Sequence, residues 1–600
     1  MGCGGGQERD CGWRMGLPWF LLLRWGFGAG PDAGRAAGGD KKPVQKNGAV
    51  SYPFRITGFL PFLGGLSDER SEKFAAVGRK PVIRKGLETA HFCRQVFISP
   101  CLHAAPVPLP NRPAKSPPRQ TKTANPFPLS LPHLELLLGV CYNFFDLEDI
   151  TMEMKLPEKV KRIIKTIEDA GYEAYAVGGC VRDSILGREP DDWDITTSAS
   201  PHQVKALFRR TVDTGIRHGT VTVMVDREGF EVTTYRIDGE YEDGRHPKEV
   251  VFTKELEEDL RRRDFTVNAM AYNDRRGLVD VFGGMEDIGK RLIRCVGSPQ
   301  ERFGEDALRL MRGVRFSAQL GYAIEGKTAA AMKSLAGNLG KISAERIRTE
   351  LVKLLVSPHP DYLRICYETG ITAVVLPEFD RCMETAQNNP HHCYTVGEHI
   401  LHSLRYVRQD KVLRLAMLLH DIGKPETKTT DGEGTDHFHG HGPVGERMAE
   451  RILRRLKFDN DTIDTVGKLV KYHDYDVEPA PRCVRRAIHK TGEDIFPLLF
   501  DVKRADIMAQ GTYLRAEKEE KLERVKAVYG DIVKAGDCVS LKTLAVSGKD
   551  LMEAGMKPGK EMGEMLQKLL EAVLEEPGKN TKEELLKLYE YFLPSFHKIG

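Results

Sequence analysis

Long apolar runs are missing from this sequence. The longest uncharged run near its start, Leu17–Leu23, has seven residues, and a second run at Leu136–Phe145 is also short. A membrane-spanning helix needs roughly 20 apolar residues, so a membrane-embedded protein is excluded. Leu17–Leu23 has the length of a signal-peptide core, but the residues that follow it favour a cytoplasmic protein.

Cysteine is also scarce, with 12 in 600 residues and no short, regular spacing. Small secreted proteins that depend on a disulfide framework have a much denser and more regular set. We therefore expect a reducing, cytoplasmic environment for this chain.

A large excess of charge of one sign is absent too, because the formal net charge is only +3. This value averages two unlike parts. Residues 1–150 hold 19 Lys and Arg against 12 Asp and Glu, with 16 of the 33 prolines and 19 of the 58 glycines, which leaves 70 basic and 74 acidic residues for the rest. Helices and strands rarely tolerate so much proline and glycine. We expect residues 1–151 to be a disordered extension or a segment upstream of the true start, rather than a targeting or RNA-binding arm.

Regular structure is predicted from about Met152 onward. Apolar residues at helical spacing predict a helix over Lys155–Ala170, and apolar stretches predict strands at Tyr172–Val177, Thr220–Val225 and Phe230–Tyr235. The helical period dominates from about residue 300. These patterns indicate an α/β or α+β head over residues 152–290, followed by an all-α remainder.

The head contains a glycine turn and three acidic residues with a shared chemistry. Gly178 and Gly179 follow a predicted strand, where a turn would direct backbone amides outward for a triphosphate. Asp192 and Asp194 are two residues apart, which places both carboxylates on one face of an extended segment. Together with Glu231 on a neighbouring strand, they form a candidate Mg²⁺ site for the in-line attack of a hydroxyl group on an α-phosphate.

Two strings carry a family resemblance. Residues 176–195 and the string Arg-Arg-Arg-Asp-Phe-Thr-Val-Asn-Ala-Met of residues 261–270 resemble the polymerase-β-like nucleotidyltransferase head of class II tRNA nucleotidyltransferases and bacterial poly(A) polymerases. The resemblance implies that a first set of residues shapes the triphosphate site: Gly178, Gly179, Arg182 and Asp183. It also implies ribose and triphosphate contacts from a second set: Arg263, Asp264 and Asn268.

A third motif, Glu-Asp-x-x-Arg, follows at residues 305–309 on a predicted helix, with Arg312 three residues further on. The resemblance implies that Asp306 and Arg309 read the incoming base and that Arg312 also belongs to the nucleotide-binding residues. An Asp acceptor beside an Arg donor fits the exocyclic amine and ring nitrogen of cytosine and adenine, and refuses uracil and guanine. A refused base would leave polar groups unpaired, at about 1 to 3 kcal/mol for each group.

The polar loop Arg236–Pro247 lies between the strand with Glu231 and the second motif. In this family such a loop is associated with the switch from C to A addition, and enzymes that add only C lack it. Its presence argues against CC-only addition. It leaves complete CCA addition, A-only addition and poly(A) synthesis open.

Ten of the 18 histidines fall between His391 and His489. The order of His and Asp motifs there resembles the all-helical HD phosphohydrolase domain. The resemblance implies a divalent metal on His399, His420, Asp421 and Asp506, with a second metal position at His441 and His473. Imidazole and carboxylate ligands suit Mn²⁺, Fe²⁺, Ni²⁺ or Mg²⁺, so the identity of this metal stays open. Hydrolysis, RNA binding and repair of a damaged 3′ end are all compatible with such a domain.

Four folded parts follow from these motifs: a head at 152–290, a helical neck and body for RNA and nucleotide binding at 291–390, an HD domain at 391–510 and a helical tRNA-binding tail at 511–600. The resemblance implies a nucleotidyltransferase that adds C, C and A to the tRNA 3′ end from CTP and ATP. The alternatives are a poly(A) polymerase or A-adding enzyme, an HD phosphohydrolase with a degenerate head, and a catalytically idle RNA-binding protein. The sequence does not indicate an oligomeric state.

Overall fold

The computed structural model describes residues 153–239 and 250–596. The extension expected at 1–151 and most of the loop at 236–247 lie outside the described residues. All seven cysteines that the structure describes are free. No helix within the two described ranges is both long and apolar enough to span a membrane.

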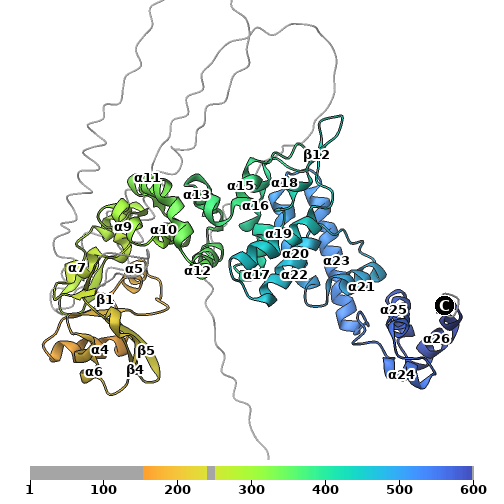
Figure 1. Ribbon diagram of the computed structural model, residues 1–600, viewed down its shortest axis with the longest axis horizontal. Coiled ribbons are helices and arrows are strands. Elements are labelled where there is room, and N and C mark those ends of the chain that lie inside the picture. The colour runs from red at the N-terminus through yellow and green to blue at the C-terminus, as the bar shows by residue number, and fades with distance from the viewer. Residues whose placement is uncertain (1–152, 240–249, 597–600) are drawn as a thin grey trace, which may run out of the picture. The chain divides into compact units, whose positions relative to one another are not determined.

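A mixed seven-stranded sheet forms the centre of the head (Figure 1), with the strand order β3-β4-β5-β2-β1-β8-β9. Its pairings are antiparallel except for the parallel pair of β2 and β5. The strands are β1 (Ala174–Val177), β2 (Ile195–Thr197), β3 (Thr211–Gly215), β4 (Thr220–Val225), β5 (Glu228–Thr234), β8 (Ala271–Asn273) and β9 (Gly277–Val279); β6 (Arg236–Asp238) and β7 (Val250–Phe252) pair separately.

The first helix of the head shows how the apolar spacing builds this fold. Helix α4 (Glu158–Asp169) buries Val160, Ile163, Ile164 and Ile167, which its sequence places on one face. These residues join one core cluster with apolar side chains of β1, β4 and β5. The predicted helix and the three predicted strands are confirmed, with ends shifted by a few residues.

The other described helices of the head are α5 (Gly179–Ile185), α6 (Pro201–Leu207), α7 (Leu256–Arg261) and α8 (Gly284–Lys290). The chain is mainly helical after residue 298, as predicted, with α9 (Pro299–Glu305), α10 (Leu308–Leu320), α11 (Gly326–Leu335), α12 (Ala344–Leu355), α13 (Leu363–Glu368), α14 (Ile371–Val375), α15 (Pro377–Glu384), α16 (Val396–Leu404), α17 (Lys411–Leu419), α18 (Lys424–Thr427), α19 (His441–Arg455), α20 (Asn460–Tyr472), α21 (Pro481–Thr491), α22 (Phe496–Ala509), α23 (Arg515–Ala535), α24 (Gly548–Glu553), α25 (Lys560–Glu575) and α26 (Lys582–Phe596).

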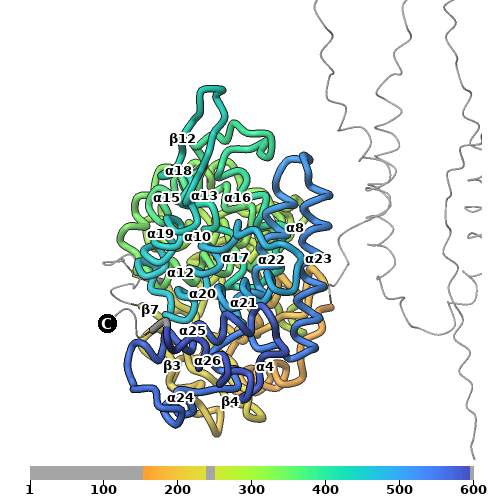
Figure 2. Tube along the Cα trace, turned by 90° about the vertical axis from the view of Figure 1, so that its right-hand side faces the viewer, coloured from red at the N-terminus to blue at the C-terminus, as the bar shows by residue number. Residues whose placement is uncertain are grey.

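One hydrophobic cluster extends from Phe265 in the head through this helical part to Tyr589. The boundaries expected near residues 390 and 510 therefore do not separate independent apolar cores. Helices α16, α17 and α22 pack together, and α19 packs against α20. Helix α22 lies beside α23 (Figure 2).

The prediction of a single helix through the Glu-Asp-x-x-Arg motif is wrong, because the structure has two helices there. Helix α9 ends at Glu305, Asp306 is extended with φ −140° and ψ 104°, and α10 begins at Leu308. The Asp306 side chain accepts a hydrogen bond from the Leu308 N–H at 2.9 Å. Aspartate competes in this way with helical backbone bonds, which accounts for the break.

Candidate functional site

Strand register brings two of the predicted acids together. Ile195 of β2 pairs in parallel with Val232 of β5, so Asp194 and Glu231, one residue earlier on each chain segment, lie side by side. The surrounding protein partly shields the Asp194 carboxylate from water, which raises its pKa. Arg263 opposes this effect, whereas Asp192 and Glu231 add to it through like-charge repulsion. The three predicted acids therefore act on one another in the head.

The glycine turn packs closely against the second motif. Gly178 has φ 86°, and a Cβ atom there would lie 2.8 Å from Nη1 of Arg263, so only glycine fits. Its N–H donates to the carbonyl of Met270 at 3.1 Å. Contrary to expectation, this amide is directed toward the protein. Gly179 begins α5.

Five of the predicted nucleotide-binding residues form one chain of hydrogen bonds. Arg182 donates to Asp183 at 2.7 and 3.0 Å and to the side-chain oxygen of Asn268 at 2.5 Å. Asn268 in turn donates to Asp264 at 3.3 Å. Arg312 donates to the other oxygen of Asp264 at 2.7 Å. Residues from three separate motifs are thus held in fixed positions relative to one another.

An aromatic ring that the sequence analysis did not single out supports this chain. The guanidinium carbons of Arg182, Arg312 and Arg315 lie 5.4, 5.3 and 4.1 Å from the ring centre of Phe316. Arg315 also pairs with the buried Glu350 at 3.0 Å. Cations over an aromatic face are attracted to it, so Phe316 helps to hold several like charges close together. The sequence feature that could have pointed to Phe316 is its position beside several arginines in the same predicted helix.

The ion pair between Asp264 and Arg312 leads to a prediction on stability. Burial alone would raise the pKa of Asp264, but Arg312 outweighs burial and holds this pKa at about 2. We expect Asp264→Asn to lower the opening free energy of α10 by about 2 kcal/mol at pH 7. A carboxyl whose pKa is depressed by folding loses its contribution as the pH falls through the folded pKa. The difference from wild type should therefore shrink between about pH 4 and pH 2.

Hydrogen exchange of peptides from α10 measures this free energy. Glu286→Gln, which removes an exposed ion pair with Lys290 on α8, is the matched control, and we expect no measurable change in this free energy from it. A loss in Asp264→Asn that does not change with pH would show that the ion pair is not its source.

The predicted base-reading residues are each fixed by a different partner. Asp306 pairs with Arg346 of α12 at 2.6 Å. Arg309 pairs with Glu305 and donates to the carbonyls of Arg302 at 3.0 Å and Arg262 at 3.1 Å. The side chains of Asp306 and Arg309 therefore have different partners, while the backbone N–H of Arg309 donates to the carbonyl of Asp306 at 3.0 Å. Arg346 was missed because no local pattern connects it to a residue 40 positions earlier.

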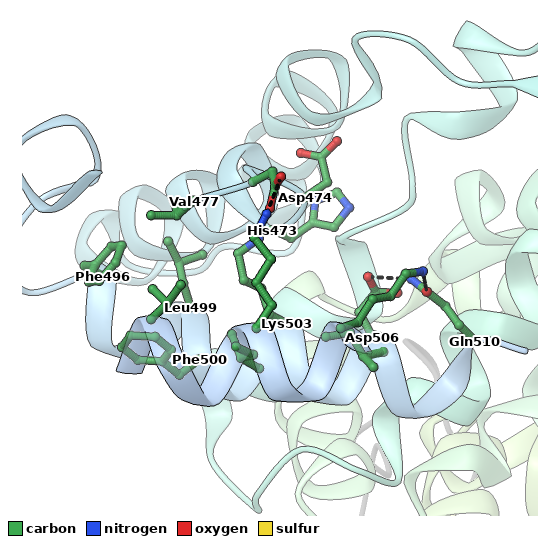
Figure 3. A pocket seen from close by; sticks show the side chains of 15 residues that line it. His473, Asp474, Val477, Phe496, Leu499, Phe500, Lys503, Asp506 and Gln510 are labelled. Carbon is green, nitrogen blue, oxygen red and sulfur yellow. Dashed lines mark hydrogen bonds and ion pairs between the residues drawn. The ribbon is translucent and has the colours of Figure 1, made fainter. Parts of the chain in front are cut away.

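The predicted HD residues converge in the helical part. Five buried side chains and the half-buried Asp506, from the ends or faces of α16, α17, α19, α20 and α22, meet there: His399, His420, Asp421, His441, His473 and Asp506. Figure 3 shows two of them, His473 and Asp506. The Nε2 atoms of His399 and His420 lie 3.2 Å apart, and those of His441 and His473 lie 3.1 Å apart. Asp506 is 2.8 Å from Nε2 of His399.

Backbone carbonyls orient three of these imidazoles. The Nδ1 atoms of His420, His441 and His473 lie 2.7 to 2.8 Å from the carbonyls of the residues three positions earlier. A carbonyl only accepts, so each Nδ1 carries the proton and each Nε2 keeps a lone pair directed into the cluster. This is the tautomer that a metal ligand requires.

Asp421 lies between the two histidine pairs. Its Oδ2 atom is 3.3 Å from His420, and its Oδ1 atom is 3.5 Å from His473. Both oxygens are buried. Oδ2 forms an ion pair with Lys424 Nζ at 2.8 Å, whereas Oδ1 has no hydrogen bond of good geometry. A buried carboxylate that faces imidazole nitrogens on both sides fits one or two divalent cations.

Among the described residues, two groups of three ligand side chains have all their ligand atoms within 4.8 Å of one another. One is His399, His420 and Asp421, and the other is Asp421, His441 and His473. The three acids of the head are not such a group. They interact electrostatically, and strand register brings Asp194 and Glu231 side by side. The ligand atoms of the histidine cluster lie closer to one another than those of the head acids.

Sequence analysis also missed His392 and Lys424 near this cluster. The His392 ring centre lies 5.2 Å from that of His399, and burial lowers the pKa of His392 to about 3. Lys424, only 6% exposed, donates to Gln387 at 2.8 Å. A cavity of about 330 Å³ opens beside these residues and reaches Asp421 and His441. Two sequence features could have pointed to these residues: the adjacent histidines at 391 and 392, and the lysine that directly follows His-Asp-Ile-Gly.

Three known families match parts of the chain. Residues 174–294 match the Poly A polymerase head domain, residues 321–383 match the probable RNA and SrmB-binding site of polymerase A, and residues 443–589 match a putative tRNA nucleotidyltransferase domain 2. The first match contains the three head acids, and the third contains His473 and Asp506.

Whole proteins are similar over most of the folded region. A CCA-adding enzyme of Lactobacillus helveticus is 36% identical over 441 residues, which are 73% of this chain and 98% of that protein. A CCA-adding enzyme of Levilactobacillus brevis is 36% identical over 409 residues, or 68% of this chain and 91% of the relative. The crystal structure of the Bacillus stearothermophilus CCA-adding enzyme in complex with CTP is 30% identical with a TM-score of 0.56, and the match covers 74% of this chain and 100% of that one.

Proposed function

Because the chain belongs to the family of CCA-adding enzymes, which are nucleotidyltransferases, we propose that it adds C, C and A to the tRNA 3′ end from CTP and ATP. The observation that supports this most is the head itself. Three acids act on one another beside a fixed chain of nucleotide-binding residues, in the region that matches the Poly A polymerase head domain.

In this proposal the 3′-hydroxyl oxygen of the tRNA bonds to the α-phosphorus of the nucleotide. The bond between that phosphorus and the oxygen that bridges the α- and β-phosphates breaks, which releases pyrophosphate. Asp192 and Asp194 would hold Mg²⁺, with Glu231 beside them, and the cation would supply positive charge for the phosphates and the attacking oxygen. Arg182, Arg263 and Arg312 would face the triphosphate and ribose. The proton leaves the hydroxyl toward this carboxylate cluster.

Base choice would be made by Asp306 as acceptor and Arg309 as donor. Each is held by its own partner, so the spacing of the two hydrogen-bonding groups is set before a nucleotide enters. Cytosine and adenine would satisfy both groups, whereas uracil and guanine would leave them unpaired.

Stepwise extension tests the proposal. Purified protein with Mg²⁺ and tRNA that ends at the discriminator base should add two nucleotides from CTP alone, and tRNA that ends in CC should gain one from ATP alone. UTP and GTP should give no product. Absence of growth with CTP would instead support the A-adding or poly(A) alternatives.

The contact between Arg346 and Asp306 gives a prediction on selectivity. Arg346→Met frees the Asp306 carboxylate, so we expect kcat/KM for CTP and ATP to fall about tenfold and UTP to be incorporated measurably. Lys353→Met, at an exposed position on the same helix, should change neither. Single-turnover incorporation of each nucleotide measures both quantities. A variant that loses rate but keeps full selectivity would assign Arg346 a purely structural role.

The histidine cluster supports a second candidate function, a metal-dependent phosphohydrolase of the HD type. Its six residues would hold one or two divalent cations, which would supply a bound water of lowered pKa and neutralise a phosphate. Water oxygen would bond to the phosphorus of a 2′,3′-cyclic phosphate end, one ester P–O bond would break, and the proton would go to the released hydroxyl. Conversion of such an end to a phosphomonoester tests this function.

The remaining expectations belong to the same proposal. Residues 291–390 would bind RNA and nucleotide, which the match at 321–383 supports, and residues 511–600 would hold the tRNA acceptor and TΨC arms. Residues 391–510 would form the HD domain. The cytoplasmic location stays a prediction from the sequence.

A further inference from the structure

The carboxylate of Asp259, near the end of α7, is completely buried in the head. Its Oδ2 atom accepts a hydrogen bond from the Thr196 hydroxyl at 3.0 Å, and its Oδ1 atom accepts one from Arg262 at 2.9 Å. Nη2 of Arg263 lies 3.7 Å from Oδ2. Burial alone would raise the pKa of Asp259, but the two arginines outweigh burial and lower it, so the side chain is an anion at neutral pH.

Asp259 holds Arg263 beside the acids of the head. In the part of the chain that the structure describes, it is the one acid within ion-pair distance of Arg263. The guanidinium of Arg263 lies against Gly178 and acts electrostatically on Asp194. Its Nε atom is buried and has no hydrogen-bond partner among the described residues. Arg263 is therefore a cation with unused donors, which suits a phosphate group.

The same carboxylate connects Arg263 to the strand that follows Asp194. Thr196 belongs to β2 and comes two residues after Asp194. The hydrogen bond from Thr196 to Asp259 and the ion pair from Asp259 to Arg263 together fix the guanidinium relative to this strand. Without the carboxylate, the like charges of Arg262 and Arg263 would repel each other at close range.

We propose that Asp259 is a positioning residue for nucleotide addition: it holds the Arg263 guanidinium where the triphosphate of the incoming nucleotide lies beside the head acids. Asp259 is buried and acts on the nucleotide only through Arg263. The inference rests on the proposed function and adds to it the group that places one of its phosphate-binding cations.

CTP binding to the full-length protein with Mg²⁺ and without tRNA, measured by isothermal titration calorimetry, tests the proposal. We expect Asp259→Asn to raise Kd for CTP about tenfold, because Arg263 loses its fixed contact with the phosphates. The affinity for cytidine, which has no phosphate and is measured by its displacement of CTP, should change less than about twofold. Glu257→Gln, an exposed acid on α7 that pairs with Arg261, is the matched control and should keep the wild-type Kd for CTP.

A variant that only disturbs the local fold would give another pattern. Arg309 donates to the Arg262 carbonyl at 3.1 Å, so a loosened turn should weaken the binding of CTP and cytidine alike. Thr196→Val removes the hydroxyl group but keeps the shape of the side chain, and it guards against a folding defect in Asp259→Asn. We expect about a threefold rise in Kd for CTP from it, with cytidine unchanged. Parallel losses for both ligands in both variants would contradict a positioning role.

A double-mutant cycle tests whether Asp259 acts through Arg263. Arg263→Met should raise Kd for CTP about tenfold in the wild-type background and less than about twofold in the Asp259→Asn background. Effects of the two substitutions that multiply would show that Asp259 acts independently of Arg263, and would overturn the proposal.

Extension of tRNA by the same proteins separates this inference from the proposed function. If the wild type binds CTP but extends no tRNA, the proposed function fails, and the binding results still decide the role of Asp259. If the wild type extends tRNA while Asp259→Asn and Thr196→Val bind CTP as the wild type does, the positioning role fails and the proposed function stands. A wild-type protein with no affinity for CTP would contradict both.

Discussion

Asp194→Asn should lower the rate of nucleotide addition by roughly a thousandfold or more. Asparagine keeps the size of the side chain but removes the negative charge that a cation and the attacking hydroxyl would need. The loss should appear in kcat at saturating CTP and tRNA, measured by single-turnover extension. Asp191→Asn, an exposed acid three residues earlier, is the matched control and should retain the wild-type rate.

The same variant should not be less stable than the wild type. Asp192 and Glu231 repel the Asp194 carboxylate, and partial shielding from water adds to the cost of its charge. Removing this charge relieves both effects, as is common where a charged site serves catalysis. A thermal midpoint at or above that of the wild type, together with lost activity, is the expected pair of results. Retention of more than a tenth of the activity would place the catalytic acid elsewhere.

Asp421→Asn should remove the metal from the histidine cluster and leave CCA addition intact. Asp421 faces both histidine pairs, so its loss affects both candidate cation positions at once. We expect bound Mn²⁺ per chain, measured by elemental analysis after dialysis, to fall at least tenfold, and hydrolysis of a 2′,3′-cyclic phosphate to fall with it. Nucleotide addition should stay within about twofold, because the head acids lie outside this cluster.

Asp501→Asn serves as the control for this variant, since Asp501 is a partly exposed acid on α22 that pairs with Arg408 at 3.1 Å. It should retain the metal and both activities. Asp421→Asn also leaves the buried Lys424 without its anionic partner, so a milder second variant, His441→Gln, guards against a folding defect. Full metal content in both cluster variants would contradict the assignment.

The sequence predicted those parts of the head that depend on local pattern. The apolar spacing of α4 and the alternation in β4 were sufficient because each buries one face against a single core. Asp192 and Asp194 were predictable as candidates as well, since two acids two residues apart in an extended segment share one face. The parallel register of β2 and β5, which puts Asp194 beside Glu231, became visible only in the fold.

Contacts between distant segments were not predictable. The apolar spacing continues across Asp306, so it suggested an unbroken helix, whereas the extended Asp306 depends on its own side-chain bond to Leu308 and on Arg346 from α12. Phe316 lies among arginines because three motifs meet there. His392 and Lys424 acquire their surroundings from helices that the sequence could not place. Such residues are determined by packing, and periodicity carries no information about them.

Product length gives the most direct test of the central claim that this chain completes tRNA 3′ ends. tRNA that ends at the discriminator base is incubated with the protein, Mg²⁺ and all four nucleoside triphosphates, and the products are sized by mass spectrometry. The account predicts extension by C, C and A followed by arrest. A ladder of many adenosines, or growth that does not begin with cytidine, would contradict it.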